Sequence, residues 1–190
     1  PMLVESHCHL AHLDITDREG GITAVLEAAK ARGISHFLSV AVDMPTSKSL
    51  IDLTAKHSNV YSSVGAHPLQ KVQQEVPSVD ELVALAQQPR VVAIGETGLD
   101  NFYSSETIDW QRASFINHLK ASQQINKPVI IHTRDARDET IDLLRQYTPS
   151  AAGVMHCFTE SWEMAEQALE LGFYISFSGI VTFASADELR

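Results

Sequence analysis

The sequence predicts an α/β fold, with a TIM-like (β/α) barrel as its architecture. Short runs rich in β-branched residues alternate along the chain with longer segments in which apolar residues recur every three or four positions. This is the order expected of parallel strands joined by crossover helices. No G-x-G-x-x-G motif follows the first strand, so the dinucleotide-binding open sheet has no support. The order of elements alone still permits another open, doubly wound sheet.

The predicted elements form about seven β/α units. Strands are expected at residues 2–5, 37–42, 60–65, 91–95, 129–131, 153–155 and 173–177. Helices are expected at residues 23–32, 47–57, 78–87, 107–124, 138–146 and 162–171. Gly33 and Gly172 follow two of these helices, and Ser78 and Ser161 stand where N-caps belong. No Pro/Ser-rich linker divides the chain, so we expect one domain over residues 1–190.

Composition excludes several classes of protein. No run approaches the ~20 apolar residues that cross a bilayer. The first residues lack the basic and apolar regions of a secretory signal. Together these observations predict a cytoplasmic protein with no membrane partner. Two cysteines are too few for a disulfide framework. The net charge of −10 argues against a nucleic-acid partner. Metal ions in an active site would add local positive charge and weaken that objection.

Ionisable residues gather at the ends of the predicted strands. In a parallel barrel these carboxyl ends face one mouth, so residues far apart in the sequence would converge there. Five of them carry side chains that bind divalent metals: His7, His9, Glu96, His132 and His156. Each alone is compatible with a solvent-facing or hydrogen-bonded residue, but their shared placement predicts a metal site. His12, His36, His57 and His118 lack this placement, and we expect His57, near a helix C-terminus, and His118, within a helix, to be structural.

The His7-Cys8-His9 segment is the most specific of these features. Side chains alternate across a strand, so His7 and His9 project to one face and can bind one metal, while Cys8 points to the other. The same parity places Cys157 towards the helices, and we expect neither cysteine to be a ligand. Imidazole and carboxylate together suit Zn²⁺, Mn²⁺ or Fe²⁺, and a carboxylate such as Glu96 can bridge two ions.

Two neighbours of the strand ends are candidate substrate-binding residues. His67, which precedes Pro68 in the third loop, could meet a substrate phosphate, although a turn before a helix would also tolerate it. Arg134 follows His132, and its guanidinium could hold a phosphate by two hydrogen bonds or lie solvated at the surface. Asp100 could orient a ligand or cap a turn.

Several segments together resemble the TatD family of metal-dependent deoxyribonucleases, within the amidohydrolase-like barrels. They are residues 4–10 (VESHCHL), 64–68 (VGAHP), 93–100 (AIGETGLD), 128–136 (PVIIHTRDA), 156–159 (HCFT) and 172–179 (GFYISFSG). They extend from one end of the chain to the other.

The resemblance implies a pair of divalent ions, Zn²⁺, Mg²⁺ or Mn²⁺. His7 and His9 would hold the first ion and His132 and His156 the second, with Glu96 between them. Glu96 and His132 are then the expected catalytic residues. The resemblance also implies that a metal-activated water hydrolyses phosphodiester bonds in DNA, the substrate partner, and that single strands are cut from the 3′ end. It implies no protein partner.

Two departures from the family pattern matter. Glu5 stands where the family usually has Asp, which could alter the surroundings of His7 and His9. The family also closes its barrel with an eighth strand that ends in Glu-Thr-Asp, whose Asp is a metal ligand. No such segment exists here, and residues 184–190 have the pattern of an N-cap and the opening turn of a helix. We therefore expect a barrel that lacks its last strand and a chain that is part of a longer enzyme.

Two alternative functions remain open. A metal-dependent hydrolase of a small-molecule amide, lactone or phosphotriester would have an almost identical site, although the carbamylated-lysine form of that site would have Lys in place of Glu96. A non-catalytic barrel could use metal only to fix its strand ends, but structural zinc sites are usually closed and rich in Cys.

Overall fold

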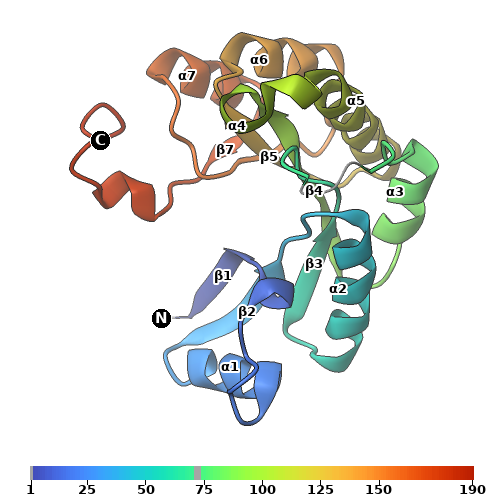
Figure 1. Ribbon diagram of the computed structural model, residues 1–190, viewed down its shortest axis with the longest axis vertical. Helices are drawn as coiled ribbons and strands as arrows, with labels where there is room; N and C mark the ends of the chain where they lie inside the picture. Colours follow the sequence, from blue (N-terminus) through green and yellow to red (C-terminus); the bar gives the residue numbers. More distant parts are fainter. Residues whose placement is uncertain (1, 71–73) are drawn as a thin grey trace.

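The computed structural model describes residues 2–70 and 74–190 and contains one sheet of seven parallel strands. The strands are β1 (Leu3–Cys8), β2 (Ile34–Ser39), β3 (Val60–Val64), β4 (Val91–Asp100), β5 (Val129–Arg134), β6 (Gly153–Met155) and β7 (Tyr174–Ile175). Their order in the sheet is their order in the chain, and Figure 1 shows them fanned into an arc. Within the described residues β1 pairs only with β2 and β7 only with β6, so the sheet stays open. This confirms the TIM-like barrel that lacks an eighth strand.

Helices lie along the outer side of the arc (Figure 1). They are α1 (Gly21–Lys30), α2 (Met44–Lys56), α3 (Val79–Ala86), α4 (Asn101–Ser104), α5 (Ile108–Ile125), α6 (Arg137–Gln146) and α7 (Trp162–Glu170), with three short 3₁₀ turns at Leu10–His12, Ser105–Thr107 and Gly179–Thr182. Ser78 and Ser161 are N-caps, as predicted. Residues 184–190 form turns rather than a helix. No helix in the described part of the chain is long and apolar enough to cross a membrane. The single domain over residues 1–190 stays a prediction.

Two strands differ from their predicted ranges in an informative way. Strand β2 lies three residues earlier than expected, because the apolar run at residues 40–42 continues past the last paired residue, Ser39. Strand β4 continues to Asp100, and its last four residues pair with β5 from Ile131 to Arg134. Gly98 permits this pairing: its φ is +142°, and a Cβ there would lie 1.8 Å from the carbonyl oxygen of His132. The absence of a side chain at Gly98 therefore allows β4 to lie close to β5.

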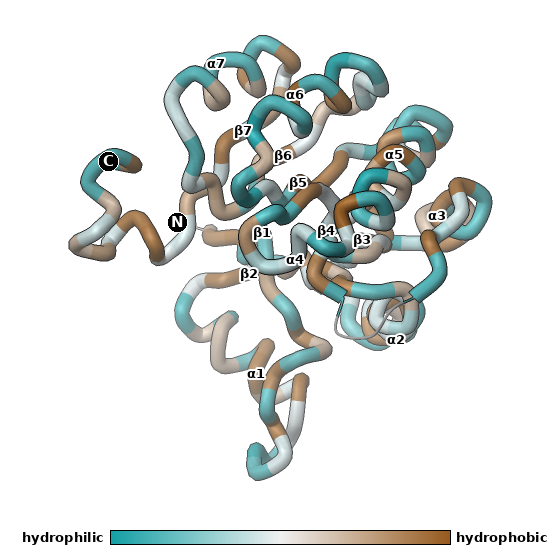
Figure 2. Tube along the Cα trace, turned by 45° about the horizontal axis from the view of Figure 1, so that its top comes forward, coloured by the Kyte–Doolittle hydropathy of each residue, from teal (hydrophilic) through white to brown (hydrophobic). Residues whose placement is uncertain are grey.

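The buried apolar residues form one large and two smaller clusters. The large cluster lies along β3 to β6, where α5 contributes the fully buried Phe115 and Leu119. Hydrophobic and hydrophilic residues alternate along α5 and α6 in Figure 2, as expected of helices with one buried face. A smaller cluster of Leu10, Leu26, Phe37 and Val60 supports β1 and β2. The end of the sheet that carries β1 therefore has a thinner core than its centre.

Candidate metal centre

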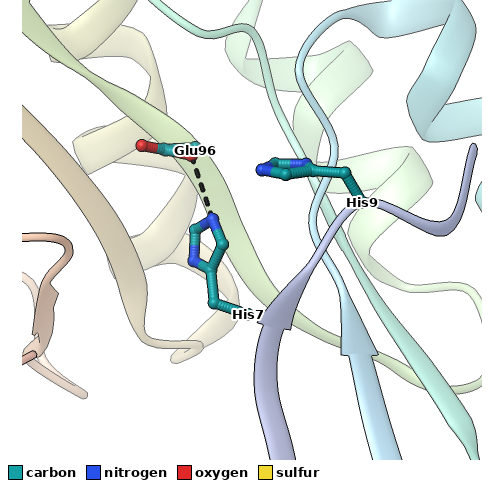
Figure 3. Close-up of side chains that lie close together, drawn as sticks. All are labelled: His7, His9 and Glu96. Carbon is teal, nitrogen blue, oxygen red and sulfur yellow. Dashed lines mark ion pairs between the residues drawn. The ribbon is translucent and has the colours of Figure 1, made fainter. Parts of the chain in front are cut away.

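Glu96 lies at the centre of the site and is only 3% exposed. Figure 3 shows His7 and His9, from the end of β1, converging on its carboxylate from β4. The Nε2 atom of His7 lies 3.3 Å from Glu96 Oε2. One ligand atom from each of these three residues lies within 4.8 Å of the others, so the group could hold one metal ion. The predicted convergence of β1 and β4 is present in the structure.

A second group meets Glu96 from the other side. The Nε2 atom of His67 and the Nδ1 atom of His132 each lie 3.6 Å from Glu96 Oε1. These three residues also offer ligand atoms within 4.8 Å of one another. The carboxylate of Glu96 is thus shared by two groups of imidazoles, one on each of its oxygen atoms, which is the arrangement that a bridging carboxylate requires.

Hydrogen bonds turn two of the histidines towards the site. The ring of His9 donates from Nδ1 to the carbonyl oxygen of Val40 at 3.0 Å, which leaves the lone pair of Nε2 free. The ring of His132 donates from Nε2 to Oδ2 of the fully buried Asp100 at 2.8 Å, so its Nδ1 lone pair faces Glu96. A carboxylate that orients a histidine in this way also makes the ring a stronger metal ligand. Asp100 has both of the roles that were considered for it. It orients His132, and it caps the following turn, where its Oδ1 accepts a hydrogen bond from Tyr103 N–H at 2.7 Å.

His67 is oriented differently. Its Nδ1 accepts a hydrogen bond from the backbone N–H of Leu69 at 3.0 Å. A neutral imidazole that accepts at Nδ1 carries its proton on Nε2, which then donates to Glu96 or to a substrate rather than binding a metal. This arrangement fits the substrate-binding role predicted for His67 better than a ligand role. The residue before His67, Ala66, is held by the fully buried His118, whose Nε2 accepts a hydrogen bond from Ala66 N–H at 2.9 Å.

His156 lies beside the first group. Its ring stacks on His7 with the centroids 3.4 Å apart and the planes 5° from parallel. Burial and the nearby His7, His9 and His132 outweigh the attraction of Glu96 and lower its pKa to about 4, so the ring is neutral at pH 7 and able to bind metal. Its ring nitrogens are not within either compact group. Its predicted place beside His132 therefore stays a prediction.

The chemistry of the donors fits a divalent ion. The Nε2 atom of His7 is buried and makes no hydrogen bond in the described residues, although Glu96 is close, so a buried lone pair or proton lacks a partner there. Burial opposes the ionisation of Glu96, but His132, His67 and His7 outweigh it and hold the pKa of the carboxyl well below its usual range. An ionised carboxylate among imidazoles is a ligand set for Zn²⁺, Mn²⁺ or Fe²⁺.

A pocket of about 340 Å³ opens beside Glu96 and extends to Arg134. Arg134 is half-buried and makes no ion pair in the described part of the chain, so its charge is available to an anion. Tyr103 also lines this pocket, and His12 lines an adjoining pocket of about 540 Å³ that reaches Glu96 as well. Neither Tyr103 nor His12 was predicted to line the site, and His12 lacks the strand-end placement of the other histidines. The signal for Tyr103 was its place three residues after Asp100, at a strand end.

The two cysteines behave differently. Cys8 points away from the site, as predicted, and donates to the carbonyl oxygen of Leu38 at 3.4 Å. Burial, with the nearby Glu5, raises the pKa of its thiol to about 12. The prediction that Cys157 faces the helices is wrong: it lines the same pocket as Glu96, with Sγ 2.8 Å from Ser178 Oγ. Strand β6 ends at Met155 and the φ of Cys157 is +47°, so strand parity does not apply to it.

The family follows from comparison with known proteins. The model of the TatD related DNase family matches residues 4–190. The chain belongs to this family. It is 47% identical to the uncharacterised metal-dependent hydrolase YcfH of Escherichia coli K12 over 189 residues, which are 99% of this chain and 71% of YcfH. It is 33% identical to the 3′-5′ ssDNA/RNA exonuclease TatD of Citrobacter koseri, over 88% of this chain and 63% of that protein.

A solved structure of the TatD family has the same fold. YjjV, a TatD homologue from Escherichia coli K12, superposes with a TM-score of 0.87 at 26% identity, over 99% of this chain and 72% of YjjV. The chain is therefore a member of a metal-dependent hydrolase family, and the His and Glu side chains around Glu96 offer ligand atoms that could hold metal. The TatD resemblance of the strand-end motifs is confirmed.

Proposed function

We propose that this TatD-family hydrolase cleaves phosphodiester bonds in DNA and degrades single strands from the 3′ end. The observation that supports this most directly is the buried, ionised carboxylate of Glu96 with imidazoles on both of its oxygens, in a pocket that also holds the unpaired Arg134. A relative with this chemistry in its name, the exonuclease of Citrobacter koseri, favours a nucleic-acid substrate over a small amide or lactone.

Each side chain has a task in this proposal. His7, His9 and Glu96 would hold one divalent ion, and Glu96, His132 and His156 a second. Such ions supply Lewis acidity, which polarises a phosphodiester and lowers the pKa of water. Asp100 holds the ring of His132 in the orientation that presents Nδ1 to the site.

Two further side chains would bind the phosphate itself. The N–H of His67 Nε2 points towards Glu96 and is available as a donor to a phosphate oxygen. Arg134 would bind the same group through its guanidinium, whose paired donors match a phosphate. The nucleophile is water, since no Ser-His-Asp arrangement is found among the described residues at this site.

The test is the digestion of a 5′-labelled single-stranded oligonucleotide by protein loaded with Zn²⁺, Mn²⁺ or Mg²⁺. We expect a ladder of products shortened from the 3′ end, and we expect a chelator to stop its formation. A panel of amides, lactones and phosphotriesters is assayed beside the DNA. Cleavage of that panel without cleavage of the oligonucleotide would replace the nuclease with a small-molecule hydrolase.

The variant His132→Ala tests whether the centre is catalytic or only structural. We expect a folded protein that has lost activity by at least about 100-fold, because a change beyond the ligand shell alone costs 10–100-fold. If the wild-type protein has no activity on any substrate and His132→Ala lowers its stability, a structural metal is supported instead.

A further inference from the structure

Two exposed aromatic rings stand at the rim of the candidate metal centre. Phe102 and Tyr103 belong to α4, the short helix that follows directly after Asp100. They are 58% and 66% exposed, and their rings meet edge to face with centroids 4.7 Å apart. Exposure of large aromatic side chains to water is unfavourable, so an exposed pair of them beside the candidate pocket suggests a binding role. The fold itself does not supply one, because α4 contributes no buried residue.

Arg134 connects the ring pair to the site. Its guanidinium carbon lies 4.8 Å from the centre of the Phe102 ring, within the range of a cation–π contact. Arg134 and Tyr103 line the pocket that contains Glu96 and His132. Phe102 and Arg134 line the adjoining pocket of about 320 Å³. A cation suited to phosphate thus lies between the hydrolytic centre and an aromatic surface.

Hydrogen bonds hold the backbone of α4 that carries the ring pair. Asp100, fully buried, accepts from the backbone N–H of Tyr103 and from the ring of His132, so one carboxylate fixes α4 relative to the metal centre. Asn101 donates from its side chain to the carbonyl oxygen of Asp135 at 3.0 Å, which ties α4 to the loop after Arg134. The buried Gln111 donates to the carbonyl oxygens of Asp100 and Ser104 at 3.1 and 2.7 Å. A surface whose backbone is already held in place loses less conformational entropy when a ligand binds.

We propose that Phe102, Tyr103 and Arg134 form a stacking platform for a nucleobase of the single-stranded substrate, next to the phosphate that is cleaved. This proposal rests on the proposed nuclease function and adds a subsite to it. Single-strand binders combine cations that bind the backbone with aromatic rings on which bases stack, and stacking accepts any base. The bases of a duplex are already stacked on each other, so the platform would favour single strands.

The test uses the double variant Phe102→Leu/Tyr103→Leu, which keeps apolar bulk but removes both rings. Neither side chain makes a hydrogen bond that holds α4, since Asp100 bonds to the backbone of Tyr103. Affinity for a fluorescent single-stranded oligonucleotide is measured with Mn²⁺-loaded protein. We expect Kd to rise by about 5- to 150-fold, the range for loss of one stacked base. The variant Phe102→Trp, which keeps a ring, should remain close to wild type.

A second arm removes the base instead of the rings. Oligonucleotides with a single abasic nucleotide at successive positions from the 3′ end are bound to both proteins. When the stacked base is removed, the affinity of wild type for the oligonucleotide should fall. The affinity of the double variant should change by less than about twofold, because the double variant already lacks the rings on which that base would stack. The matched control is Tyr174→Ala, which removes a 76% exposed aromatic ring at the start of β7, the end of the strand away from the mouth. It should bind like wild type.

The outcomes separate the two proposals. If wild type cleaves the oligonucleotide but the double variant binds every substrate as tightly as wild type, the platform is wrong and the nuclease remains. If the double variant loses affinity equally for all abasic oligonucleotides, the rings do not stack on a base and the platform is also wrong. If metal-loaded wild type neither binds nor cleaves the oligonucleotide, both proposals are overturned.

Discussion

On one side of Glu96, His132 lies on β5 in the middle of the sheet, and the fully buried Asp100 holds its ring at 2.8 Å. On the other side, His7 lies on the edge strand β1, and its buried Nε2 has no hydrogen bond in the described residues. The large core cluster supports β5, whereas β1 is supported by a small one. The register of β1 with β2 is irregular between Glu5 and Cys8, the segment that contains His7.

This difference shows that the two halves of the candidate centre reach their geometry in different ways. The half on β5 is preorganised by side-chain hydrogen bonds and close strand packing before any ion binds. In the half on β1, His9 is held by its hydrogen bond to the carbonyl oxygen of Val40, but the Nε2 atom of His7 has no hydrogen-bond partner in the described residues. We expect a bound ion to supply the missing constraint on that side.

The largest expected effect comes from the close approach of β4 to β5. In Gly98→Ala the new methyl group would lie 1.8 Å from the carbonyl oxygen of His132, at a φ of +142° that alanine rarely adopts. The strands must separate, and we expect the free energy of unfolding to fall by more than about 3 kcal/mol, measured by chemical denaturation. Gly179→Ala is the matched control, because nothing lies within 4 Å of its added Cβ and we expect less than about 0.5 kcal/mol. Equal stabilities of the two variants would refute the role of Gly98.

The second prediction concerns His118 of α5 and the way in which the free energy of unfolding depends on pH. Burial outweighs the hydrogen bond to Ser114 and lowers the pKa of His118 to about 4, below its value of 6.5 in the unfolded chain. The unfolded state therefore takes up the proton first. The contribution of His118 to stability should fall by roughly 3 kcal/mol as the pH decreases from about 6.5 to 4, and this contribution should level off below pH 4.

The variant His118→Gln isolates this contribution from that of the other histidines. It should be less stable at pH 7, because the acceptor for Ala66 N–H is disturbed, but its stability should decline less between pH 6.5 and 4. Denaturation at a series of pH values measures both slopes. Parallel curves for wild type and variant would show that His118 is not held neutral by the fold.

The third prediction compares the carboxylates next to the two halves of the centre. In Asp100→Asn one amide oxygen must serve two donors, so His132 or Tyr103 N–H loses its acceptor, and we expect metal affinity to fall about 10- to 100-fold. Among the described residues, the one hydrogen bond that the Glu5 side chain accepts comes from the backbone N–H of His7, at 3.3 Å. Glu5→Gln should therefore change affinity by less than about threefold. Calorimetric titration with Zn²⁺ measures both, and equal losses would remove the contrast between the two sides.

The strand-end positions of the site residues could be predicted from the sequence because strand and helix periodicity places the carboxyl ends of parallel strands at one mouth. His7, His9, Glu96 and His132 converge for that reason. The packing of Cys8 away from the site follows from the same alternation. These features depend only on local patterns that the chain repeats.

Other features depend on distances between strands, which no local pattern contains. The sequence does not show why residue 98 is glycine, and only the pairing of β4 with β5 gives the reason. Cys157 lies one residue beyond the regular strand end, at a positive φ, where alternation no longer applies. The orientation of His67 is set by the N–H of Leu69, a hydrogen bond made within its own loop.

If Glu96 bridges two ions, crystals of the Mn²⁺- or Zn²⁺-loaded protein should show two peaks of anomalous scattering. We expect one peak between Glu96 and the pair His7 and His9, and the other between Glu96 and His132. A single peak, or peaks that Glu96 does not contact, would show that Glu96 is not a bridging ligand.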